Sequence, residues 1–169
     1  SVLTVPGFSQ NSNSNINFQQ VDEFARTVRY NGDLQELTNT LTTPYADSMY
    51  KLRAIFIWIA DNIEYDYKLF NSGSNEWNRF ECYGSRETCA QARLDWNNKH
   101  LEHVLNKKKT VCNGYTKLFK RMCNMAGIQN EMVDGYVKKT PFQIGLVLNV
   151  SHTWNVVNLG GVNYYFDVT

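Results

Sequence analysis

Three residues in the C-terminal half of the chain have the side chains needed for covalent amide chemistry: a cysteine, a histidine and an aspartate. Cys112 stands directly before the run "NGYTKLFKRM", whose apolar residues recur at helical spacing, so it is predicted to begin a helix. A helix N-terminus stabilises an anion through its unpaired N–H groups and the positive end of the macrodipole. We therefore expect this position to favour the thiolate, the nucleophilic form of cysteine. The alternative is a small hydrophobic residue at the start of a core helix.

A nucleophilic thiol needs a partner that takes and returns a proton, and the chain has three histidines. His100 and His103 lie in a polar, lysine-containing part of a predicted helix, and we expect them to face solvent. His152 lies in the predicted strand "SHTWNVV", where a lone histidine is more often structural than catalytic. Asp167 in the next predicted strand favours a catalytic role for His152, because a carboxylate can hold an imidazole in one tautomer and orientation.

The contact between His152 and Asp167 depends on the loop of the predicted hairpin "SHTWNVVNLGGVNYYFDV". With a two-residue loop at Gly160-Gly161, Trp154 faces Asp167 and His152 is the diagonal neighbour on the same face. A four-residue loop pairs His152 with Asp167 directly, whereas a three-residue loop puts them on opposite faces. The hairpin register therefore decides whether the three residues can form one site.

The segments that must position these residues change from helical to strand type along the chain. Apolar periodicity predicts helices that begin near Phe18 and near Leu34, and further helices over 45–66, 86–105 and 112–126. Short apolar runs then predict strands at 131–139, 145–150, 151–157 and 162–168. Residues 66–85 read as a long loop of the kind that often contributes to binding sites, and residues 1–16 as a loosely ordered arm. Helices followed by an antiparallel sheet predict the α+β class.

Composition excludes several classes of function. A chain of 169 residues that is 43 % hydrophobic fits a single domain, 1–169, with a continuous core. Its net charge of +1 gives no overall field to recruit nucleic acid or a membrane surface, and no run of about 18 apolar residues predicts membrane insertion. The expected partner is a peptide or protein substrate. The oligomeric state and the compartment stay open, including export after removal of a signal.

The four cysteines do not form the paired C-x-x-C pattern of a zinc site, so we expect no metal and no cofactor. Cys82 and Cys89, separated by "YGSRET", could close a small disulfide loop if the chain is exported. Two buried free thiols are the alternative, and the one we favour at this point.

Three stretches resemble the transglutaminase-like superfamily of papain-like folds: "KLRAIFIWIADNIEYD", "TVCNGYTKLFKRMCNMAGIQNEMVDGYVK" and "SHTWNVVNLGGVNYYFDVT". The second and third are specific as a pair, with a helix-capping Cys, an "AGI" turn into a "V-x-G" strand, then "H-x-W-N" and "D-V-T". The first stretch is similar to that of the bacterial and kyphoscoliosis-peptidase-like branches. The resemblance implies a papain-like core in which the Cys-bearing helix packs on an antiparallel β-sheet. One domain of a longer protein is an alternative to a complete chain.

By this resemblance, Cys112 is the nucleophile, His152 the general base and acid, and Asp167 the residue that orients His152. The implied reaction is hydrolysis of peptide or protein amides through a thioester. Alternatives are acyl transfer to a lysine amine, which cross-links proteins, and a non-catalytic module of the same fold that binds peptides or cell-wall material. The backbone N–H of Cys112 is the natural first donor to the oxyanion, with Trp77 or Tyr65 as candidates for the second.

Overall fold

The computed structural model describes residues 17–73, 75–138, 140–146 and 149–169, so the predicted arm at residues 1–16 lies outside the described residues. The α-helices are α1 (Gln19–Thr27), α2 (Leu34–Thr42), α3 (Ser48–Asn62), α4 (Tyr67–Ser72), α5 (Arg86–Lys107) and α6 (Cys112–Met125). The strands are β1 (Glu64–Tyr65), β2 (Lys109–Thr110), β3 (Glu131–Gly135), β4 (His152–Leu159) and β5 (Val162–Phe166). Two short 3₁₀ helices are η1 (Glu76–Asn78) and η2 (Pro141–Gln143).

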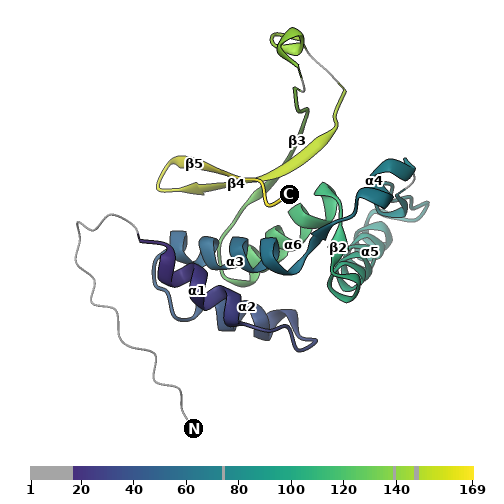
Figure 1. Cartoon of the computed structure of the whole chain (residues 1–169). Helices are drawn as coiled ribbons and strands as arrows, with labels where there is room; N and C mark the ends of the chain where they lie inside the picture. Colours follow the sequence, from purple (N-terminus) through teal and green to yellow (C-terminus); the bar gives the residue numbers. More distant parts are fainter. Residues whose placement is uncertain (1–16, 74, 139, 147–148) are drawn as a thin grey trace.

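The helical part of the core is built around α3, whose sequence is apolar on most of its circumference. The helix starts where the Asp47 side chain accepts a hydrogen bond from the backbone N–H of Met49, as an N-cap does. Trp58 on α3 is 2 % exposed, and its indole N–H donates to the carbonyl of Val28 just after α1. Figure 1 shows α1 and α2 on one side of α3, and α6 and the sheet on the other.

The sheet is antiparallel in the order β3-β4-β5. Leu159 pairs with Val162 across a two-residue turn, Gly160-Gly161, in which both residues have positive φ. Positive φ at both turn positions matches the twist of a tight hairpin and favours glycine there. Of the three loop lengths considered for the hairpin, the two-residue loop is the one that forms, and the predicted α+β class is confirmed.

The sheet packs on α6 through the face of β4 that alternates inward. Val157 of β4 is fully buried, and Phe166 of β5 stacks on Phe119 of α6 with ring centroids 5.1 Å apart. Val168 joins the same core, so the segment that follows β5 is anchored by a buried side chain. This packing places the start of β4 beside the start of α6.

Two predictions of secondary structure were wrong. The predicted loop at residues 66–85 contains α4 and η1, because Asp66 and Asn75 accept N-cap hydrogen bonds from Leu69 and Trp77. The strand predicted at residues 145–150 does not form in its described part, and residues 147–148 lie outside the described residues. Its described apolar residues, Leu146 and Val150, instead belong to the long connection between β3 and β4, whose described part extends away from the body of the molecule in Figure 1.

Cys82 and Cys89 form a disulfide, which corrects the interpretation of two free thiols. The bridge closes a short loop at the start of α5, where Ser85 caps the helix by accepting a hydrogen bond from Thr88. Cys112 and Cys123 are free, and Cys123 lies in the core. None of the helices in the described ranges is both long and apolar enough to cross a membrane.

Candidate active site

Cys112 is the first residue of α6, as its position in the sequence predicts. The helix start is held from both sides: Tyr115 donates its hydroxyl hydrogen to the carbonyl of Ile63 at 2.8 Å, and β2 pairs with β1 just upstream. Gly114 follows within the first turn, and a Cβ there would collide with the side chain of Thr110 on β2. The close approach of β2 to α6 therefore requires glycine at position 114.

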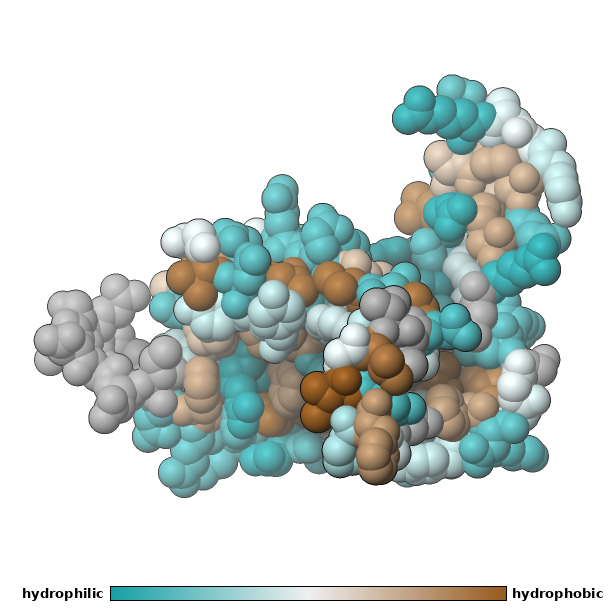
Figure 2. Space-filling model, turned by 90° about the horizontal axis from the view of Figure 1, so that it is seen from above, coloured by the Kyte–Doolittle hydropathy of each residue, from teal (hydrophilic) through white to brown (hydrophobic). Residues whose placement is uncertain are grey.

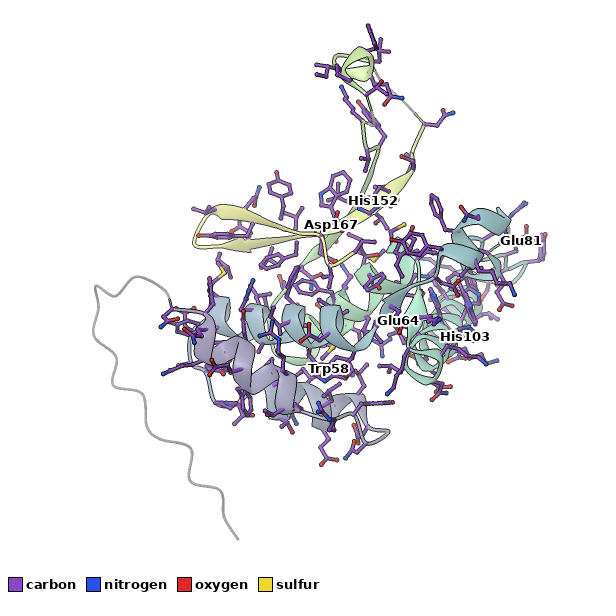
Figure 3. All side chains as sticks on the ribbon, in the orientation of Figure 1. Trp58, Glu64, Glu81, His103, His152 and Asp167 are labelled. Atoms are coloured by element: carbon purple, nitrogen blue, oxygen red, sulfur yellow. A yellow bond between two sulfur atoms is a disulfide. The ribbon has the colours of Figure 1, made fainter. Side chains whose placement is uncertain are left out.

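His152, the first residue of β4, and Asp167, which directly follows β5, are in direct contact. The Nε2 atom of His152 lies 2.7 Å from Oδ2 of Asp167, and Figure 3 shows the two side chains next to each other above α6. A carboxylate only accepts hydrogen bonds, so Nε2 carries the hydrogen and Nδ1 is the nitrogen left to take a proton. The backbone N–H and the hydroxyl of Thr169 donate to the other oxygen of Asp167, which fixes the carboxylate.

Burial alone would raise the pKa of Asp167, but the hydrogen bonds from His152 and Thr169 outweigh it and lower that pKa. The carboxylate is therefore ionised at neutral pH. The indole of Trp154 lies beside the imidazole, with ring centroids 6.0 Å apart. Trp154 also covers Gly135 of β3, where any Cβ would collide with the indole.

Asn155 ties β4 to α6 and was not singled out from the sequence. Its side chain is fully buried, and its amide donates to the carbonyl of Thr116 at 3.1 Å and to the side-chain oxygen of Asn130 at 3.2 Å. The Thr116 hydroxyl in turn donates to the carbonyl of Cys112. A chain of hydrogen bonds thus links the strand of His152 to the helix of Cys112. The asparagine of "H-x-W-N" was visible as part of a motif, but this link requires the fold.

A pocket of about 510 Å³ holds the thiol and the imidazole together. Its walls come from α4, the segment after it, the start of α6, β3 and the start of β4. The described residues that line it are Leu69, Phe70, Gly73, Asn75, Val111, Cys112, Asn113, Met132, Asp134, Val150, Ser151, His152 and Thr153. The predicted nucleophile and base therefore face one cavity, whereas most of the other lining residues were not anticipated because they come from distant segments.

The surroundings of Cys112 do not favour a standing thiolate, contrary to the expectation from its place at a helix start. Burial is the largest influence and raises the pKa of the Cys112 thiol. Hydrogen bonds from the backbones of Asn113 and Thr153 act in the opposite direction, while the carboxylates of Asp167 and Asp134 raise the pKa further. The net direction is upward, so the resting thiol is protonated at neutral pH. A base must remove the proton before the sulfur can attack.

Trp77 and Tyr65, the two candidates for the second oxyanion donor, occupy different surroundings. The ring of Trp77 stacks parallel on the imidazole of His100, with centroids 4.7 Å apart, and also contacts Trp96. Tyr65 stacks on Tyr115, and Cys112 is one of the charges that raise the pKa of its phenol. Neither residue belongs to the described lining of the pocket, and Tyr65 is the one whose pKa Cys112 influences.

His100 is buried, at 2 % exposed, and not solvent-facing as predicted, whereas His103 is exposed. The Nδ1 atom of His100 accepts a hydrogen bond from the ammonium group of Lys117 at 3.3 Å. Burial, followed by the charges of Lys117 and His103, lowers the pKa of His100 to about 3. A neutral imidazole in an aromatic cluster is a structural element, and Figure 3 shows His103 of the same helix on the side of the molecule away from Asp167.

Comparison with known proteins agrees with this architecture. A family model described as the transglutaminase-like superfamily matches residues 34–167. The chain is similar to the kyphoscoliosis peptidases of Mus musculus and Homo sapiens, each 32 % identical over 154 residues that make up 90 % of this chain and 20 % of the relative. It therefore spans about a fifth of the length of these curated relatives. The match covers α2 to the end of β5 together with Asp167, and the chain belongs to the transglutaminase-like superfamily.

Proposed function

We propose that the chain is a cysteine-dependent amide hydrolase that acts on peptides or proteins through Cys112, His152 and Asp167. The observation that carries this proposal is the 2.7 Å contact between His152 Nε2 and Asp167 Oδ2 beside a pocket that also contains the Cys112 thiol. A base oriented by a carboxylate next to a thiol is the arrangement of nucleophilic amide catalysis. The similarity to two proteins named kyphoscoliosis peptidase supports hydrolysis of peptide bonds.

The chemistry follows from the groups in the pocket. The Nδ1 atom of His152 takes the thiol proton as Cys112 Sγ attacks the amide carbon, and the ion pair of Asp167 with the resulting imidazolium stabilises the charge. The imidazolium then returns the proton to the leaving amine, the C–N bond breaks and a thioester remains. Water, deprotonated by the same imidazole, releases the acid and restores the thiol.

Hydrolysis is favoured over transfer to an amine because the pocket is open to water. Val150, one of its lining residues, is 67 % exposed, and Asp134 is exposed as well. Efficient transfer needs exclusion of water from the thioester, which calls for an enclosed site.

The test is a cleavage assay on an unfolded protein substrate, with new termini identified by mass spectrometry and acid-quenched samples searched for a thioester on Cys112. Cys112→Ala should abolish cleavage, and His152→Gln should lower kcat by about a thousandfold or more. His103→Gln is the matched control, because it makes the same change at an exposed histidine, and it should leave the rate unchanged.

Parallel reactions with an excess of a primary amine separate hydrolysis from transfer. An amine adduct in place of the free acid would assign the chain to cross-linking acyl transfer. Substrate that binds to the wild-type chain and to Cys112→Ala equally, without any cleavage or adduct, would overturn the catalytic proposal in favour of a binding module.

A further inference from the structure

Asp134 lines the pocket but has no role in the steps of the proposed reaction. It lies on β3 directly opposite Thr153 of β4, and directly opposed residues of an antiparallel pair point to the same face of the sheet. The backbone of Thr153 makes a hydrogen bond to the Cys112 thiol, so this face of the sheet is turned toward the nucleophile. Asp134 lines the same pocket as Cys112 and His152.

The carboxylate of Asp134 is not neutralised by the protein around it. It makes no hydrogen bond or ion pair with any residue that the structure describes, and its side chain is exposed. The described lining of the pocket contains no Lys or Arg, and its histidine is already paired with Asp167, which is ionised. The negative charge of Asp134 nevertheless reaches the nucleophile, because it contributes to the raised pKa of Cys112. The pocket therefore carries a net negative potential.

A second unsatisfied group lies beside the carboxylate. Thr153 is buried, at 6 % exposed, and its Oγ1 atom has no hydrogen-bond partner among the described residues. A buried hydroxyl without a protein partner is unusual, and a ligand group or a water in the pocket that Thr153 lines would complete it. The two oxygens together match an ammonium or guanidinium group, which carries several donors and no acceptor.

The walls of the pocket match the rest of a long basic side chain. Leu69 and Phe70 of α4 contribute apolar surface on one side, and Met132 and Val150 contribute it at the β3 and β4 side. Phe70 is 52 % exposed, so its ring is available to a ligand. The methylene stem of a lysine or arginine packs on such surface while the charged end reaches a carboxylate.

We propose that this pocket selects polypeptide substrates with a lysine or arginine next to the scissile amide, and that Asp134 is the residue that binds the positive charge. The proposal rests on the proposed amide hydrolase function for its substrate. Asp134 acts on selection and takes no part in the covalent steps.

Charge selectivity at Cys112 can be measured without catalysis. Cationic trimethylammonium-ethyl and anionic sulfonato-ethyl methanethiosulfonates are matched thiol reagents, and mass spectrometry locates each adduct at Cys112 while Cys123 stays buried in the core. At low ionic strength the rate ratio, cationic over anionic, should fall about tenfold in Asp134→Asn. Taking the ratio cancels the change in thiolate fraction that follows from removing the charge.

Glu131→Gln is the control, because it removes one negative charge from the same strand at a residue outside the pocket lining that pairs with Lys120. Its ratio should equal that of the wild-type chain. An Asp134→Asn ratio that matches Glu131→Gln would overturn the proposal. Screening by 0.5 M salt should lower the wild-type ratio toward that of Asp134→Asn, and a ratio insensitive to salt would also count against it.

Peptide substrates then test the selection itself. Three peptides that differ only by Lys, Gln or Glu beside the cleaved bond should rank in that order by kcat/KM, and the Lys-to-Gln ratio should fall about tenfold in Asp134→Asn. Asp134→Lys should reverse the order of Lys and Glu. Cleavage that depends on Cys112 but has the same kcat/KM for the three peptides would refute the proposed selection of basic residues. It would leave the amide hydrolase proposal standing. No cleavage of any peptide would refute the hydrolase, and the thiol reagents would still decide the charge preference.

Discussion

At the scale of single residues, the chemistry-bearing side chains were the most predictable part of this protein. Cys112 and His152, the proposed nucleophile and base, could be singled out because they lie in short motifs whose local structure is set by neighbours in sequence. Asp167 required one further step, the hairpin register, which "NLGG" indicates because only glycine adopts positive φ at two successive positions at low cost. His100 was misplaced because the ring that covers it, Trp77, comes from a segment whose position no local pattern reveals.

The pKa of Cys112 was also beyond local inference. The helix start argues for a low value, and the pocket that buries the thiol appears only once α4, β3 and β4 are assembled around it. Burial is a property of the tertiary structure, and here it outweighs the hydrogen bonds that the backbone offers.

Tyr65 is the stronger of the two candidates for the second oxyanion donor. Its hydroxyl makes no hydrogen bond with a described residue, and burial, followed by the charge of Cys112, raises its pKa, so the phenol stays a donor at neutral pH. We predict that Tyr65→Phe lowers kcat about a hundredfold with little change in stability. The neighbouring Tyr67, which is exposed, provides the control variant Tyr67→Phe. Equal rates for the two variants would exclude Tyr65 and turn attention to Trp77→Phe.

At the scale of elements, long periodic helices were predicted well and short or irregular segments were not. The helices α3 and α6 bury a continuous apolar stripe or run, which sequence periodicity detects, whereas α5 buries apolar residues only in its last turns. Helix α4 has six residues within a stretch rich in Asn, Ser and Gly, and its Asp66 cap is its clearest signal. The apolar run at 145–150 looks like a strand because hydrophobic residues are normally buried, whereas here Leu146 and Val150 are exposed.

Those exposed residues lie on the long β3–β4 connection. Figure 2 looks down on this side of the molecule and shows strongly hydrophobic side chains near the middle of the view, where the connection points toward the viewer. Exposed apolar residues on this scale need a functional explanation. The connection ends at the pocket through Val150, so the same exposed apolar surface borders the pocket of Cys112 and His152.

The contact of α6 with β2 gives a prediction in which packing opposes helix propensity. Alanine is favoured over glycine in a helix by about 1 kcal/mol, but a methyl group at position 114 meets the Thr110 side chain. Thr110 cannot retreat easily, because its carbonyl accepts a hydrogen bond from Asp66 at 2.8 Å. We predict that Gly114→Ala lowers the free energy of unfolding by about 1–3 kcal/mol, measured by urea denaturation.

The Thr110→Ala change supplies the check. It removes two of the three side-chain atoms that a Cβ at position 114 would meet. The double variant should therefore lose less stability than the sum of the two single variants. Additive losses would show that the crowding is relieved by movement of the backbone.

At the scale of the whole molecule, the succession of helices and then strands was enough to predict the class, and the assembly of the pocket was not. The pocket is lined from segments that lie up to 84 residues apart, between Leu69 and Thr153, and the buried amide of Asn155 holds two of them together. Contacts over such separations depend on how complete elements pack, which periodicity within one element does not contain. The Cys82–Cys89 disulfide closes a short loop, but the sequence alone did not decide it, because a bridge depends on backbone distance as well as on the two cysteines.

Acid stability of the entire fold should depend on His100. Its pKa is about 3 in the folded chain against an ordinary value of 6.5, so below pH 6.5 the unfolded chain binds a proton that the folded chain does not. This favours unfolding progressively until about pH 3. Between pH 7 and pH 4.5 the wild-type free energy of unfolding should fall about 2–3 kcal/mol more than that of His100→Asn.

His103→Asn is the matched control on the exposed side of the same helix, and it should stay close to the wild-type curve because His103 is the smallest of the three influences on the pKa of His100. Chemical denaturation at several pH values measures both. Parallel curves for wild type and His100→Asn would mean that His100 takes up its proton without unfolding. In that case a local rearrangement would separate the His100 imidazolium from the charges of Lys117 and His103.

The Cys82–Cys89 disulfide is kept closed by oxidising conditions, whereas the free Cys112 thiol is preserved by reducing conditions. Conditions that keep the bridge closed also oxidise exposed thiolates, to sulfenic acid or to mixed disulfides, because the thiolate is the form that reacts. The raised pKa of Cys112 keeps its resting form protonated and therefore slow to react with oxidants. The burial that weakens Cys112 as a resting nucleophile therefore also protects the thiol beside a closed disulfide.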